Sequence, residues 1–152
     1  MSLQGPNMDE FLKGRSGRQA GKRLQEEQVR IATRQQVCSM MESGDWSEAE
    51  SKHLIGLFIV LFERVYGVPC SELSGPSRFY AAKQAGELLE ERFDGDAGAM
   101  VHYMRWAWER EAEREQWRRQ NRRDGATMNW RWMFAPGKTL DEYTLAQARR
   151  RP

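Results

Sequence analysis

The feature that most constrains the fold is a nine-residue apolar run, Leu54–Phe62, with the sequence LIGLFIVLF. Glu63 and Arg64 end the run, which is too short for a membrane span, since a spanning helix needs about 20 apolar residues. A helix that is apolar on every side must be buried on every side. We therefore predict that this segment is the central helix of a folded domain, and we expect no membrane contact.

The rest of the chain has the punctuation of a helical protein. No segment combines sustained apolar–polar alternation with β-branched residues, so no strand is predicted. Turns rich in glycine and proline separate helices that we predict over 18–42, 47–66, 76–93 and 97–122, followed by a short helix after Thr139. The predicted fold class is all-α: a compact bundle of four to five helices with a basic N-terminal arm and a Trp/Arg-rich C-terminal segment.

Local signals refine the ends and faces of these helices. Ser47 and Glu50 have the spacing of a capping box, and Asp96 stands where it can cap the fourth helix. The apolar stripe of the first helix is narrow, which indicates an arm laid along another surface rather than a core helix; it contains Leu24, Ile31 and Cys38, with Val37 and Met41. The packed side of the third helix is predicted to contain Phe79, Ala82, Ala85, Leu89 and Phe93.

A chain of 152 residues is the size of one domain. We predict a flexible basic N-terminus over 1–17, a helical domain over 18–135 and a basic C-terminal helix and tail over 136–152. Residues 1–7 could derive from an expression vector and are left out of the fold prediction. No signal peptide is visible, so we expect a cytoplasmic protein.

Two cysteines exclude a disulfide scaffold, and Cys38 and Cys70 form no CxxC motif. We expect reduced, buried or half-buried thiols. The two histidines lie far apart in the sequence, so neither a metal site nor a cofactor is predicted.

The net charge of +2 is an average over segments of opposite sign. Formal charges are +3 over 1–36, −6 over 37–100 and +5 over 101–152, and eleven of the 19 arginines lie from Arg105 to Arg151. Such segregation serves either a polyanionic partner or docking of the basic ends on an acidic surface, the chain's own middle included. Composition alone leaves both interpretations open.

Basic residues recur every four positions on the fourth predicted helix: Arg110, Arg114, Arg118 and Arg122. At 1.5 Å per residue they stand about 6 Å apart along the axis, a spacing comparable to that of successive phosphates on a nucleic-acid strand. Glu111 and Glu115 lie three or four positions from several of these arginines, so a solvated, salt-linked helix is the alternative for the first part. Acids are absent from 116 to 123, where Arg119 and Arg123 widen the stripe, and phosphate binding is favoured there.

Tryptophan is concentrated in the same region. Five of the six lie from Trp106 to Trp132, and Trp117, Trp130 and Trp132 are interleaved with arginine. Aromatic rings beside arginine are typical of proteins that stack single-stranded bases. Of Trp130 and Trp132, which stand two positions apart, we predict that one faces inward and that the other contacts a base. The alternative is an aromatic mini-core, which we favour for Trp106 and Trp108.

Two aromatic motifs and a short basic tail mark the C-terminal half, about 78–150: Trp106-Ala107-Trp108, and then the sequence NWRWMF over 129–134. This half resembles the end of phage-encoded replication accessory proteins of the DnaD-like, replisome-organiser type. The resemblance implies a helical domain that binds DNA, often single-stranded, and contacts replication partners.

Motifs for catalysis are missing. The segment SGRQAGKR lacks the first glycine and the final Ser/Thr of a phosphate-binding loop, and Glu87, Glu90 and Glu91 fit the solvated face of a helix better than an acid–base pair. We predict a non-enzymatic, phage- or mobile-element-encoded accessory protein that binds nucleic acid, DNA in preference to RNA, within a replication or regulatory complex. The predicted contact residues are Arg114, Arg118, Arg119, Arg122, Arg123, Trp130, Arg131 and Trp132. The alternative is a helical adaptor or inhibitor that binds an acidic protein partner.

Overall fold

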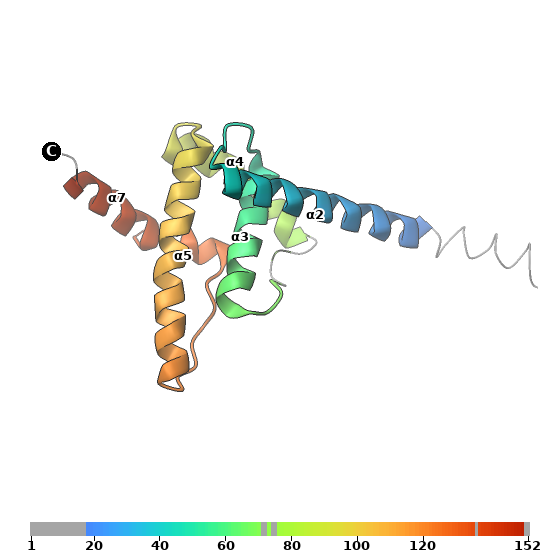
Figure 1. Ribbon diagram of the computed structural model, residues 1–152. Coiled ribbons are helices and arrows are strands. Elements are labelled where there is room, and N and C mark those ends of the chain that lie inside the picture. The colour runs from blue at the N-terminus through green and yellow to red at the C-terminus, as the bar shows by residue number, and fades with distance from the viewer. Residues whose placement is uncertain (1–17, 71–72, 74–75, 136, 151–152) are drawn as a thin grey trace, which may run out of the picture.

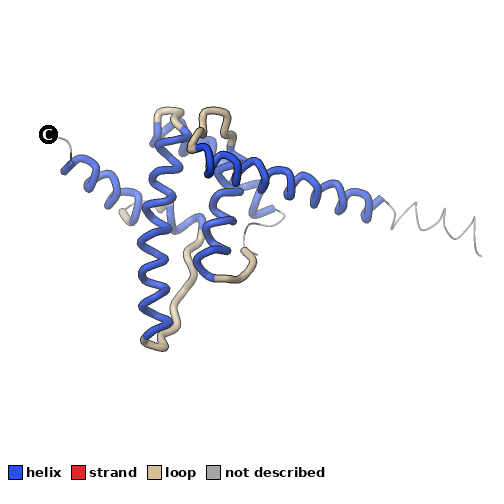
Figure 2. Tube along the Cα trace, viewed as in Figure 1, coloured by secondary structure: helices blue, strands red, loops and turns tan. Residues whose placement is uncertain are grey.

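The computed structural model describes residues 18–70, 73, 76–135 and 137–150. These residues form helices and no strand (Figures 1 and 2). The helices are α2 (Arg18–Ser43), α3 (Ser51–Tyr66), α4 (Pro76–Phe93), α5 (Ala97–Gln120), α6 (Trp130–Met133) and α7 (Thr139–Arg150). The predicted all-α bundle is confirmed, whereas the flexible segment predicted over 1–17 lies outside the described residues.

Helix α3 is the centre of the fold. It packs against α2, α4 and α5, and Leu54, Leu57 and Phe58 are completely buried. Gly67 ends the helix in the left-handed conformation (φ 71°), where its N–H donates to the carbonyl of Glu63, as is usual for a glycine after a last turn. The apolar run therefore forms the buried middle of the domain, as predicted. No helix among the described residues has the length and apolar character to span a bilayer.

The start of α3 differs from the prediction. The helix begins at Ser51, and the backbone N–H of Glu50 donates to Nδ1 of His53 at 2.8 Å. Ser47 instead donates its hydroxyl to Oδ1 of Asp45 at 2.6 Å. The predicted pairing of Ser47 with Glu50 is therefore wrong, because a buried histidine supplies the acceptor that a capping box usually takes from Glu or Gln.

Helix α2 leaves the bundle as an arm (Figure 1). Thr33 and Val37 are buried in its C-terminal half, where they contact Gly56 of α3. Leu24 and Ile31 remain more than half exposed. The arm is as expected, and Val37 of the predicted stripe helps to dock it, whereas Leu24 and Ile31 do not and Thr33 was not predicted.

Two further differences concern helix faces and ends. Phe79, predicted on the packed side of α4, is 84% exposed, whereas Ala85 and Phe93 on the same helix are buried. Helix α5 ends at Gln120 rather than at 122, because the chain turns through a left-handed residue, Arg122 (φ 52°). The predicted cap of α5 is confirmed, since the Asp96 carboxylate accepts the N–H of Ala99 at 3.2 Å.

Candidate nucleic-acid interface

The arginine stripe of α5 divides into inward and outward members. Arg118 is only 16% exposed in its side chain, and its Nη2 lies 3.0 Å from Oε1 of Glu111 and 2.8 Å from Oε2 of Glu115. The hydrogen bond from Arg118 is the main cause that lowers the pKa of the Glu115 carboxyl. Arg118 therefore neutralises two carboxylates of its own helix, which differs from the predicted phosphate contact.

Glu111 links Arg118 to the rest of the core. Its carboxylate is buried and accepts the hydroxyl of Tyr66 at 2.9 Å. The same tyrosine oxygen accepts the backbone N–H of Met128 at 2.6 Å, and burial raises the pKa of Tyr66 above its usual range. This network joins α5, α3 and the segment that leads to α6.

Arg119 also contacts the protein itself. Its Nη2 donates to the carbonyls of Val65 (3.3 Å) and Tyr66 (3.2 Å) at the end of α3, and its Nε donates to Glu115 at 3.3 Å. A cation at a helix C-terminus satisfies carbonyls that have no partner within the helix. The side chain is still 60% exposed, but its Nη2 is directed at α3 and its Nε at Glu115. The phosphate contact predicted for Arg119 stays a prediction.

The end of α5 has an unusual backbone. The N–H of Arg123 donates to the carbonyl of Arg118 at 2.8 Å, and the N–H of Arg122 donates to that of Arg119 at 3.4 Å. This pairing is a Schellman motif, in which glycine usually occupies the left-handed position. Here Arg122 occupies the left-handed position. The tip of the helix therefore has an exposed guanidinium where glycine would have no side chain.

Outward-facing arginines lie around an exposed tryptophan, Trp117, which is not among the predicted contact residues. Trp117 is 56% exposed and lies in a shallow hollow that Arg114 and Arg123 also line. Among the described residues, neither of these arginines forms an ion pair within 4 Å, and the same holds for Arg122 and Arg131. The residues three and four positions from Trp117 on the helix are all polar. This pattern in the sequence predicts that the ring of Trp117 faces solvent.

The Trp/Arg segment after α5 is also divided. Trp130 is buried against Phe58 and Phe134, and its Nε1 donates to Oε1 of Gln84 at 3.0 Å. Its indole is therefore not exposed for base stacking, and the alternative in which Trp130 contacts a base is wrong. Because 130–133 is a helical turn rather than an extended strand, the two inward positions are 130 and 133 instead of alternate residues.

Arg131 and Trp132 lie on the outer side of that turn. Arg131 is exposed, and the half-buried Trp132 has the Lys138 ammonium 5.9 Å from its ring centroid. Neither lines the hollow around Trp117, and Figure 1 shows α6 beside the middle of α5 rather than at its tip. The predicted contact residues thus form no single patch.

In the part of the chain that the structure describes, no three His, Cys, Asp or Glu side chains gather as a metal site. Comparisons with protein-family models, curated proteins and solved structures find no significant match to this chain.

Proposed function

We propose that the protein is a non-catalytic nucleic-acid-binding accessory protein that holds a single strand at the tip of α5. The observation that carries the proposal is Trp117, a ring that is more than half exposed in a hollow shared with Arg114 and Arg123. An exposed indole beside guanidinium groups is suited to stacking a base while the neighbouring cations contact phosphates.

Among the described residues, Arg114, Arg122 and Arg123 form no ion pair within 4 Å, although Glu113 and Asp124 also line the hollow. Arg114, Arg122 and Arg123 are exposed, and each phosphate contact that they make would release a counterion. A slope of about −0.7 in log K against log salt is expected for each such contact with a single strand, so three contacts give a slope of about −2.

A labelled single-stranded DNA, titrated with the full chain at several salt concentrations, tests the proposal by fluorescence anisotropy. DNA is the first polymer to try because of the resemblance to replisome organisers. Trp117→Ala is expected to weaken binding roughly five- to hundredfold, since stacking contributes about 1–3 kcal/mol per base.

Arg122→Gly separates charge from fold. Glycine is the residue that favours the left-handed position of Arg122, so the variant should keep the helix end intact and lower the salt slope by about 0.7. The control is Arg105→Gln, an exposed arginine in the first half of α5 and therefore away from the helix tip; it should change neither the affinity nor the salt slope appreciably. Absence of binding at low salt, or unchanged affinity in Trp117→Ala, contradicts the proposal.

A further inference from the structure

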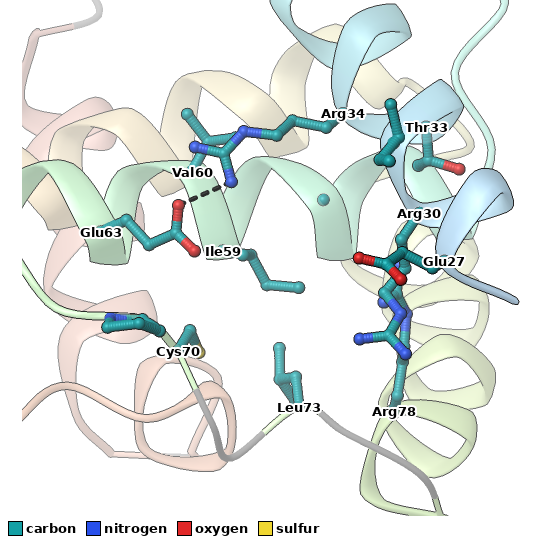
Figure 3. A pocket seen from close by; sticks show the side chains of 13 residues that line it. Glu27, Arg30, Thr33, Arg34, Ile59, Val60, Glu63, Cys70, Leu73 and Arg78 are labelled. Carbon is teal, nitrogen blue, oxygen red and sulfur yellow. Dashed lines mark ion pairs between the residues drawn. The ribbon is translucent and has the colours of Figure 1, made fainter. Parts of the chain in front are cut away.

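A cavity of about 320 Å³ opens between α2, α3 and the start of α4 (Figure 3). Ile59 and Leu73 point into it, and the ion pair between Arg34 and Glu63 (2.6 Å) stands at one end. The volume lies at the lower limit of the pockets that hold small ligands, about 300–1,000 Å³. The cavity is therefore large enough for one or two side chains of another molecule.

Two arginines without an acidic partner lie at the other end of this cavity. Arg30 of α2 and Arg78 of α4 both line it, and neither forms an ion pair within 4 Å among the described residues. Burial, followed by the positive charge of Arg30, lowers the pKa of Arg78. Glu27 also lines the cavity and lies near the two arginines in Figure 3, but no ion pair joins it to either. Two guanidinium groups held together in this way favour an anion between them.

The same two arginines border a second hollow on their far side. Arg30, Thr33 and Arg78 are shared by both hollows, and the second is completed by Val29 and Phe79 among others. Phe79 is 84% exposed and Val29 57% exposed. The first hollow contains Ile59 and Leu73, the two arginines form a basic centre, and in the second hollow Val29 and Phe79 lie among charged side chains that include Lys22 and Lys52.

We propose that this surface is the docking site for a segment of a partner protein in which one or two carboxylates stand between two apolar side chains. The carboxylates pair with Arg30 and Arg78, and the apolar side chains enter the cavity beside Leu73 and cover Phe79. A nucleic-acid backbone would match the basic centre but would leave Leu73 and Phe79 uncovered, whereas an acidic segment with flanking apolar side chains matches the arginines and both apolar side chains. The site is separate from the tip of α5 and does not depend on the function proposed for it.

A displayed library of random peptides, selected on the full chain, tests the proposal without a known partner. The enriched sequences should carry acids flanked by apolar residues. A labelled synthetic peptide of the enriched sequence is then titrated by fluorescence anisotropy. Arg78→Gln and Phe79→Ala should each weaken it about tenfold, which corresponds to about 1.4 kcal/mol. Phe79 is so exposed that its replacement should leave the fold intact.

The matched control is Arg64→Gln, an exposed arginine of α3 that lines neither hollow; it should leave the affinity unchanged. Failure to enrich, enrichment of peptides without acids, or equal affinity for Arg78→Gln and the original chain overturns the proposal. Two other occupants would overturn it as well. Single-stranded DNA that displaces the peptide only when Arg78 is present identifies a nucleic-acid surface. A dimer in light scattering that Phe79→Ala dissociates identifies a second copy of the chain.

Discussion

Replacement of Arg118 by leucine tests whether this arginine stabilises the fold, as its contacts indicate. The substitution leaves the Glu111 carboxylate, 5% exposed, with the Tyr66 hydroxyl as its remaining hydrogen-bond partner among the described residues. Removing one member of a fully buried ion pair costs about 3–5 kcal/mol. Arg118 keeps 16% of its side chain exposed, so water can replace part of the interaction. We therefore expect the free energy of unfolding to fall by about 2–3 kcal/mol.

Urea denaturation followed by circular dichroism measures this loss. Arg114→Leu is the matched control, because it makes the same substitution on the same helix at an exposed arginine, where changes are usually within about 0.5 kcal/mol. A double variant, Arg118→Leu with Glu111→Gln, removes the buried charge but keeps an acceptor for Tyr66. It should recover about 1 kcal/mol or more of the loss. Equal costs for Arg118→Leu and Arg114→Leu, with no recovery in the double variant, would refute the structural role of Arg118.

Further predictions concern a histidine, two glycines and a helix cap. Burial, more than the nearby positive charge of the preceding lysine, lowers the pKa of His53 below 6.5, so neutral imidazole is favoured in the fold. The stability from this group is complete above pH 6.5 and is lost as the pH falls through the folded pKa. His53→Gln keeps an acceptor for the Glu50 N–H and should flatten the profile of unfolding free energy below pH 6.5. An unchanged profile would argue against this role of His53. Gly56→Ala should destabilise by about 1–3 kcal/mol, because its Cβ would meet a valine methyl of α2 at 2.9 Å. In Gly21→Ala the added Cβ would have no atom within 4 Å, and the variant should stabilise the fold by about 0.5–1 kcal/mol. Melting temperatures that shift in the same direction for both glycine variants would contradict these two predictions. Asp96→Ala should lower the unfolding free energy by about 1 kcal/mol and Asp96→Ser should not, which thermal denaturation can check.

The helices were predictable because their signals are local. The all-apolar run, the glycine after α3 and the aspartate before α5 each act within a few residues of the position they determine. Phe79 was predicted inward for a different reason. Periodicity identifies which face of a helix is apolar, but it does not show where along that face a neighbouring helix begins. The same limit explains the cap of α3, where the residue that supplies the acceptor, His53, also needs Gln36 of α2 for its second nitrogen (2.8 Å).

The tryptophans show why part of the candidate site was misassigned. Trp130 begins a helical turn. In an extended segment, with a period of 2.0, positions 130 and 132 would lie on the same face, whereas the helical period of 3.6 brings 130 and 133 together and turns 132 away. No local signal distinguishes the two conformations over only four residues. Trp117 lies in a long helix, where polar residues at three and four positions on either side already indicate an exposed ring.

The arginines of α5 differ because a four-residue repeat does not follow one face of a helix. Four residues advance about 400° around the axis, so each step of the stripe rotates by about 40°. A seven-residue step returns to within about 20° of the same direction, and from the buried Met104 such steps lead to Glu111 and then to Arg118. The arginine that continues an apolar seven-residue seam therefore turns toward the core and meets the carboxylate that precedes it on that seam, whereas Arg114 lies off the seam. A repeat of like charges along a helix therefore overstates the charge that is available to a ligand. On this helix Arg114, together with Arg122 and Arg123 beyond the helix end, is left for the proposed contact with a strand.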